Sequence, residues 1–294
     1  MNTVPVNESA CSFGEERQLT GVYTPGQGEK ADNPCVVYLT AGLLHHIGPT
    51  RLHVEMARAL ARERIPGFRF DLSGVGDSET SALGGYFQER SVSEVQQAMN
   101  YLQAEFGHHA FVLVGLCSGA DDALAAAALD RRVNGLVLLN GYAYRAGYFG
   151  VFRLLRFYLP RIAMPAKLVG RVLRLGKRLM KKEGVEVSAD RRALDLLDSD
   201  YRYVPPREET EKLLGRLERE HTQMLWVYTG SEHDDYTYEG QFFAMFPQLL
   251  NSPFVQEHYA KLADHTFILE ADRIMLIEQV RAWYAQATFK RIAQ

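Results

Sequence analysis

Residues 111–129 read FVLVGLCSGADDALAAAAL, and this stretch decides the fold. Its first part, 111–116, is an unbroken apolar run typical of a buried strand, and its last part, 119–129, is an alanine-rich helix. Cys117 stands between them with a glycine two positions before it and another two positions after it. A sharp turn from strand to helix requires small residues at those two positions. The stretch therefore predicts Cys117 as a nucleophile presented at the end of a strand.

Two other interpretations of this turn are possible. Ser118 could be the nucleophile, but its flanking positions would then be Leu116 and Ala120, which suit a tight turn less well. The cysteine could also be an unreactive thiol at a glycine-rich strand end.

Strand and helix patterns alternate on both sides of the turn. The predicted strands are 35–39, 68–72, 111–116, 133–139 and 224–229, and the predicted helices are 53–64, 91–106, 119–129 and 274–289. Residues 4–13 and 18–23 are expected to form a hairpin leading into the sheet. Nearly all-apolar strands alternating with helices predict an α/β fold, with a mostly parallel sheet covered on both faces.

Residues 142–219 interrupt the alternation, because they have helical periodicity and no clear strand. We expect them to form an inserted helical cap over the carboxyl edge of the sheet, where open α/β sheets bind ligands. The predicted core then comprises residues 1–141 and 220–294.

A base and an orienting carboxylate are expected later in the chain. His265 lies shortly before the last predicted helix, in a late loop that can reach across the top of the sheet. The loop after strand 224–229 offers three acids, of which we favour Asp234, then Asp235, then Glu232. The carboxylate would accept the imidazole Nδ1–H and fix the tautomer.

The loop after strand 35–39 reads TAGLLHHIGP and suits an oxyanion hole. In such a site, one backbone N–H comes from this loop and one from the residue after the nucleophile, which predicts Leu43 and Ser118. His45 and His46 could be metal ligands, but no third ligand has a helpful spacing. We therefore predict no metal.

The glycine-rich stretch 71–78, DLSGVGDS, matches neither a dinucleotide fingerprint nor a phosphate-binding loop. We expect a structural turn beside the active site, and no cofactor.

Composition excludes several classes of protein. The chain has 294 residues, of which 47% are hydrophobic, and a net charge of −3, which argues against a general nucleic-acid-binding surface. Its three cysteines form no CxxC pair, so neither a disulfide framework nor a cysteine-based zinc site is expected. The sequence shows no secretory signal and no apolar run of membrane-spanning length, which predicts a cytoplasmic protein.

Together, the segments AGLLHHIGPTRLH, RFDLSGVGDS, VGLCSGA, YTGSEHDDY and ADHTF resemble the α/β-hydrolase superfamily, in that superfamily's order. The sequences of the first two segments are most similar to those of bacterial hydrolases found beside exopolysaccharide-export or natural-product gene clusters. The resemblance implies an α/β-hydrolase fold with a catalytic triad. Cys117 departs from the usual serine, which puts simple esterase or lipase activity in doubt.

A cysteine nucleophile bears on the substrate class. A thiolate is a strong nucleophile and also a good leaving group, so its attack on an oxoester tends to reverse. When the thiolate attacks a thioester, two thiolates of similar leaving ability compete, so the exchange is nearly balanced. The acyl-cysteine that forms can pass its acyl group to water, an amine or an alcohol. We therefore expect a thioesterase or an acyltransferase.

Residues 149–184 contain ten basic side chains and one acidic side chain. Five of the basic residues recur at helical spacing, namely Lys167, Arg171, Arg174, Arg178 and Lys181. This basic stripe could be a solvated face, a dock for an acidic acyl carrier protein or the phosphates of coenzyme A, or a membrane contact.

Overall fold

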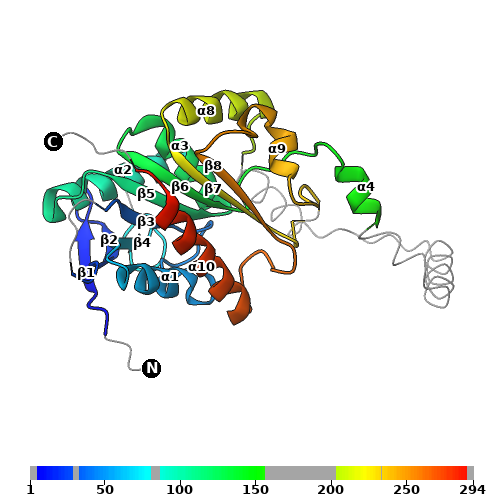
Figure 1. The fold of residues 1–294 in the computed structure, drawn as a ribbon. Helices are drawn as coiled ribbons and strands as arrows, with labels where there is room; N and C mark the ends of the chain where they lie inside the picture. The colour runs from blue at the N-terminus through cyan, green and yellow to red at the C-terminus, as the bar shows by residue number, and fades with distance from the viewer. Residues whose placement is uncertain (1–4, 29–32, 81–86, 156–202, 233, 290–294) are drawn as a thin grey trace, which may run out of the picture.

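One mixed sheet runs through the protein (Figure 1). The computed structural model describes residues 5–28, 33–80, 87–155, 203–232 and 234–289. Across these residues the eight strands are β1 Ser9–Phe13, β2 Leu19–Thr24, β3 Cys35–Leu39, β4 Gly67–Phe70, β5 Phe111–Leu116, β6 Val133–Leu139, β7 Gln223–Thr229 and β8 Val255–Ala260. Their order in the sheet is β1-β2-β4-β3-β5-β6-β7-β8. β1 pairs antiparallel with β2, and β2 with β4, whereas all other neighbours are parallel.

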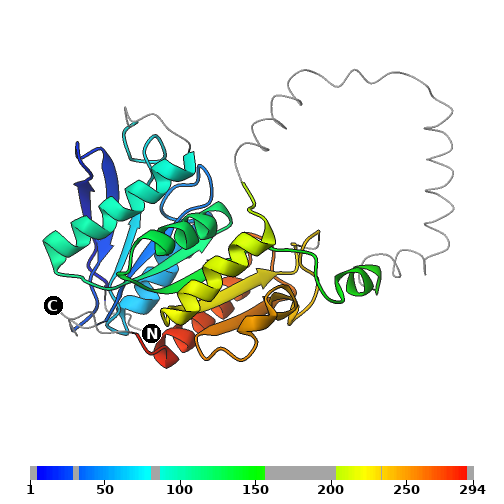
Figure 2. The same cartoon turned by 90° about the horizontal axis from the view of Figure 1, so that it is seen from above.

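Helices cover both faces of this sheet (Figures 1 and 2). The helices of the described residues are α1 Leu52–Ala61, α2 Phe87–Phe106, α3 Ser118–Leu129, α4 Phe149–Arg153, α8 Arg207–Arg219, α9 Gln241–Met245 and α10 Glu270–Gln286, with short 3₁₀ turns at Pro49–Arg51 and Pro247–Leu249. α2, α3 and α8 pack on one face through side chains such as Met99 and Leu214. α1 and α10 pack on the other through side chains such as Leu60 and Trp283. The predicted α/β class is confirmed.

The order of the strands fixes where a site can form. β3 lies between β4 and β5, so the chain leaves β3 toward one side of the sheet and later returns on the other. At such a switch point the loops that follow the two parallel strands diverge and leave a crevice at their carboxyl ends. The loop after β3 and the turn after β5 are two of the segments for which the sequence predicts catalytic groups.

The structure departs from the sequence prediction at several elements. β8 was missed, because only its two end residues, Val255 and Ala260, are buried, and the polar residues between them give no apolar run. The last helix runs over Glu270–Gln286 and so begins four residues before the predicted start.

The predicted cap is described only in part. α4 and α8 are helical segments inside 142–219, whereas residues 156–202, with the whole basic stripe, lie outside the described residues. The division into core and cap stays a prediction. Among the described helices, none combines the length and the apolarity that crossing a bilayer requires.

Candidate active site

Cys117 occupies the strained turn that the sequence predicts between β5 and α3. Its backbone has φ 54° and ψ −119°, a conformation that costs energy for any residue with a side chain. Its N–H donates to the carbonyl of Leu139 at 2.8 Å, which ties the turn to the end of β6. A Cβ on Gly115 would lie 2.1 Å from the carbonyl oxygen of Gly119, and one on Gly119 would lie 2.6 Å from the carbonyl oxygen of Leu39. The two glycines are therefore required by close approach of the backbone.

The imidazole of His265 lies against Cys117. His265 follows β8 in the loop before α10, and its side chain is about one-third exposed (34%). A hydrogen bond with Cys117, followed in importance by one with Glu232, raises the pKa of His265 from 6.5 to about 9. Nδ1 faces Oε1 of Glu232, so Nε2 is the nitrogen left to exchange a proton with the thiol.

Glu232, and not Asp234, is the carboxylate in contact with His265. Asp234 instead accepts a hydrogen bond from Arg153 of α4 at 3.0 Å, and Asp235 accepts one from Arg145 at 3.2 Å. Our prediction of Asp234 is therefore wrong for this contact.

The reason is a tight turn immediately after β7. The N–H groups of Asp235 and Tyr236 both donate to the carbonyl of Glu232, at 3.1 and 2.7 Å. The turn keeps Glu232 near the strand end, beside the histidine loop, and carries the two aspartates toward the basic side chains around α4.

The side chain of Ser118 is hydrogen-bonded to the loop after β3. Its Oγ accepts a hydrogen bond from the N–H of Gly42 at 2.8 Å. Ser118 is also the first residue of α3, so its own N–H has no acceptor within the helix. This hydrogen bond holds the loop that carries Leu43 beside the first turn of α3, the arrangement that an oxyanion hole formed by the N–H groups of Leu43 and Ser118 requires.

Replacing Ser118 by alanine tests this role. Loss of the acceptor for Gly42 N–H should lower kcat/KM by about 3- to 10-fold, the equivalent of one ordinary hydrogen bond, while acylation of Cys117 persists. The comparison is Ser93→Ala on the exposed face of α2, which should leave kcat/KM unchanged. Complete loss of acylation in Ser118→Ala would instead make Ser118 the nucleophile.

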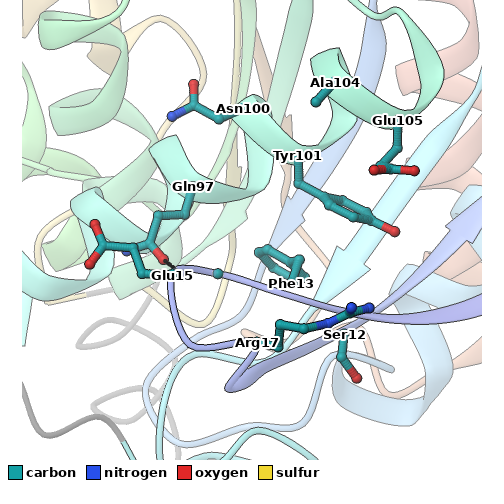
Figure 3. A pocket seen from close by; sticks show the side chains of 10 residues that line it. Ser12, Phe13, Glu15, Arg17, Gln97, Asn100, Tyr101, Ala104 and Glu105 are labelled. Carbon is teal, nitrogen blue, oxygen red and sulfur yellow. Dashed lines mark hydrogen bonds between the residues drawn. The ribbon is translucent and has the colours of Figure 1, made fainter.

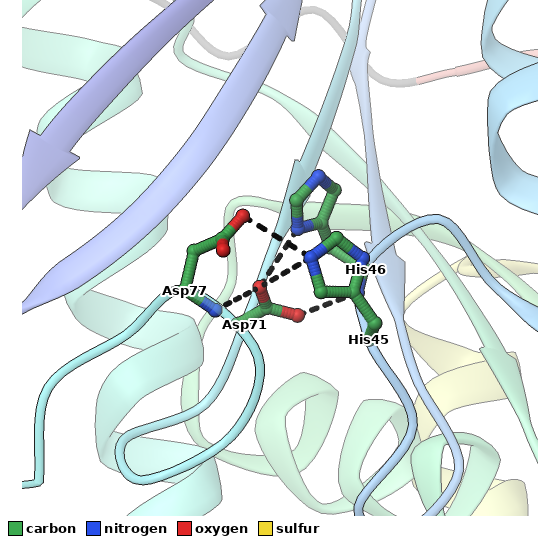
Figure 4. Close-up of side chains that lie close together, drawn as sticks. All are labelled: His45, His46, Asp71 and Asp77. Carbon is green, nitrogen blue, oxygen red and sulfur yellow. Dashed lines mark hydrogen bonds and ion pairs between the residues drawn. The ribbon is translucent and has the colours of Figure 1, made fainter.

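Four side chains clamp the loop after β3 to the turn after β4 (Figure 4). Nδ1 of His46 lies 2.8 Å from Oδ2 of Asp71, and Nε2 of His45 lies 3.1 Å from Oδ2 of Asp77. The Asp71 side chain is fully buried. Burial raises its pKa, but hydrogen bonds from His46 and from the N–H of Asp77 outweigh burial and leave the pKa below its ordinary value.

This cluster also corrects the argument by which a metal was excluded. The ligand atoms of His45, His46, Asp71 and Asp77 lie within 4.8 Å of one another, so the missing third and fourth ligands come from the turn after β4. Such a donor set is one that zinc accepts. However, Nδ1 of His45 accepts the N–H of Ile47 at 3.3 Å, which places the imidazole proton on Nε2, the atom that a metal would need. The hydrogen bonds therefore favour a protein clamp over a metal site.

A surface pocket lies elsewhere, between the β1–β2 turn and α2 (Figure 3). Phe13, Arg17, Gln97 and Tyr101 are among its lining residues. It contains none of the groups around Cys117, so we do not assign it to the reaction.

Comparisons with known proteins agree with this fold. Residues 39–164 match a family model described as alpha/beta hydrolase fold. No curated protein matches the sequence.

Among solved structures, an esterase from Pyrococcus furiosus is 11% identical, with a TM-score of 0.60 over 96% of this chain and 91% of that one. Proline iminopeptidase from Mycobacterium smegmatis is 13% identical, with a TM-score of 0.52 over 96% and 100%. Mouse alpha/beta hydrolase domain-containing protein 10 is 17% identical, with a TM-score of 0.51 over 95% and 100%. The chain has the α/β-hydrolase fold.

Proposed function

We propose that this chain is an acyl-transfer enzyme that works through an acyl-cysteine on Cys117, with His265 as the base and Glu232 as the residue that orients it. The observation that carries the proposal is the chain of contacts between three groups: a thiol on a strained strand–helix turn, an imidazole hydrogen-bonded to it, and a carboxylate in contact with Nδ1 of that imidazole. This is the arrangement that nucleophilic catalysis by a thiol needs.

The proposed reaction has two halves. The thiol proton of Cys117 first moves to Nε2 of His265, which leaves a thiolate beside an imidazolium, and Sγ then attacks the acyl carbon. The N–H groups of Leu43 and Ser118 stabilise the oxyanion. Collapse of the intermediate breaks the bond to the leaving group, which takes the proton from His265. Water or a second substrate then attacks the acyl-cysteine, His265 accepts its proton, and the thiol of Cys117 is restored as the product leaves.

The nucleophile favours thioesters or other activated acyl donors. The similar structures named esterase and iminopeptidase point to acyl-bond chemistry in general. A thiolate leaving group departs from the tetrahedral intermediate about as readily as Cys117 does, whereas an alkoxide departs less readily. An acyl carrier protein or coenzyme A is our proposed carrier of the donor, and we propose that its negative charges are met by the basic residues that the sequence places in the stripe.

The experiment compares a thioester and an oxoester that carry the same acyl chain. We expect the thiol to be released faster than the alcohol, and the difference to lie in the acylation step. Equal release, or faster release of the alcohol, would contradict the thioester assignment.

The pKa of His265 predicts the pH dependence of acylation. Because its contacts raise that pKa, the imidazolium persists to high pH. The imidazolium gives the leaving group its proton, so the acylation rate should fall as pH rises through about 9 and this donor is lost. Glu232→Gln removes the negative charge that favours the imidazolium, so the alkaline limb should move to lower pH. The measurement is the rate of single-turnover thiol release between pH 6 and 10. A limb that stays in place in Glu232→Gln would show that this carboxylate does not act on His265.

A further inference from the structure

Asn140 is a buried polar residue at the carboxyl end of β6, and sequence analysis did not single it out. Only 1% of it is exposed, and its φ of 51° places it in the left-handed region, which asparagine tolerates better than most residues. Its N–H donates to the carbonyl of Val227 at 2.8 Å, so its backbone is fixed to β7.

The orientation of its side-chain amide follows from its hydrogen bonds. Oδ1 accepts from the N–H of Thr229 at 2.9 Å and lies 3.2 Å from the hydroxyl of the same residue. A backbone N–H can only donate, so the oxygen must face β7 and the NH₂ must face the histidine loop. Nδ2 donates to the carbonyl of His265 at 3.2 Å and lies 3.3 Å from its Nδ1.

The same network reaches the loop that carries the carboxylate. The hydroxyl of Thr229 is 2.9 Å from the hydroxyl of Ser231, which immediately precedes Glu232. One asparagine thus touches the histidine loop directly and, through Thr229 and Ser231, the segment next to Glu232. Within the described residues, the titratable groups that interact with the imidazole are Cys117 and Glu232.

We propose that Asn140 is a positioning residue that holds the His265 loop and the Glu232 loop in the relative position at which the imidazole contacts both Cys117 and Glu232. The inference rests on the proposed function, since this position matters only if His265 exchanges a proton with Cys117. It predicts that a change at Asn140 alters the behaviour of the imidazole as well as the stability of the fold.

Two substitutions separate positioning from stability. Asn140→Asp keeps the shape and the acceptor for Thr229, but it loses the donor to the His265 carbonyl and adds a negative charge beside Nδ1. Asn140→Ala removes both contacts. Asn134→Ala is the matched control, since Asn134 is a buried asparagine near the start of β6, the strand that Asn140 immediately follows.

Single-turnover acylation is measured against pH for each folded variant. We expect acylation at least about 10-fold slower in both Asn140 variants, comparable with the loss of a buried hydrogen bond. The alkaline limb should move to higher pH in Asn140→Asp, where the new charge favours the imidazolium. It should move to lower pH in Asn140→Ala, where the contact with Glu232 loosens. Asn134→Ala should lower the melting temperature and leave the limb in place.

Wild-type rates and unshifted limbs in both Asn140 variants would overturn the proposal. If neither variant folds, Thr229→Val interrupts the network from its other end while keeping the backbone donor, and a wild-type limb in that variant would overturn it equally. Failure of the proposed function is distinguishable, because it would appear as the absence of an acyl group on Cys117 in the wild-type protein.

Discussion

Cys117→Ala should abolish turnover and acyl-enzyme formation while leaving the fold intact. The substitution removes the nucleophile but keeps both glycines of the turn, and Cys117 is only partly buried, so little packing is lost. We expect a loss in kcat of at least about 1,000-fold, in line with removal of a nucleophile from a triad. The measurements are steady-state thiol release and thermal unfolding.

Cys11→Ala is the control, since this partly buried cysteine on β1 lies outside the candidate site. It should retain wild-type turnover. Turnover near the wild-type level in Cys117→Ala would end the nucleophile assignment, whatever the other variants do.

Glu232→Gln and Asp234→Asn should differ sharply, although each removes one negative charge from the same loop. Glu232→Gln replaces the acceptor of the Nδ1 proton with a group that can turn its own NH₂ toward the ring, which disfavours the reactive tautomer. We expect kcat to fall by about 100-fold or more.

Asp234→Asn breaks only a solvent-exposed pair with Arg153, so kcat should stay within about twofold of wild type and stability within about 1 kcal/mol. The reverse ranking of the two variants would restore our sequence-based choice of Asp234 and refute the role that the geometry gives to Glu232. Parallel determination of kcat and KM separates a chemical defect from a binding defect.

The parts of the fold that could be predicted are those with strong local signals. β5 and α3 meet in a stretch where apolar residues, glycines and alanines all indicate one turn, and the structure has that turn. β8 could not be found in this way. Its polar middle is stabilised by pairing with β7, a non-local contact that leaves no periodicity in the sequence.

The carboxylate that contacts His265 was not the one predicted, for a similar reason. The sequence shows three acids within four residues, and all three are plausible partners for an imidazole. Which of them faces His265 depends on the turn after β7 and on Arg145 and Arg153, which attract Asp235 and Asp234. The two arginines lie more than 80 positions away in the chain, so sequence spacing could not reveal the competition.

The clamp between the loop after β3 and the turn after β4 was hidden in the same way. His45 and His46 were evident as a pair, but their partners Asp71 and Asp77 come from the turn after β4. The parallel pairing of β3 and β4 brings the two segments together. Residues that meet only through sheet topology require the fold to be known first.

The most direct test of the central claim is the mass of the intact protein after brief incubation with an acyl thioester and acid quenching, followed by peptide mapping. The account predicts one added acyl group, located on Cys117, present in Ser118→Ala and absent from Cys117→Ala. An acyl group mapped to Ser118, or none at all while the thiol is released at the full rate, would contradict it.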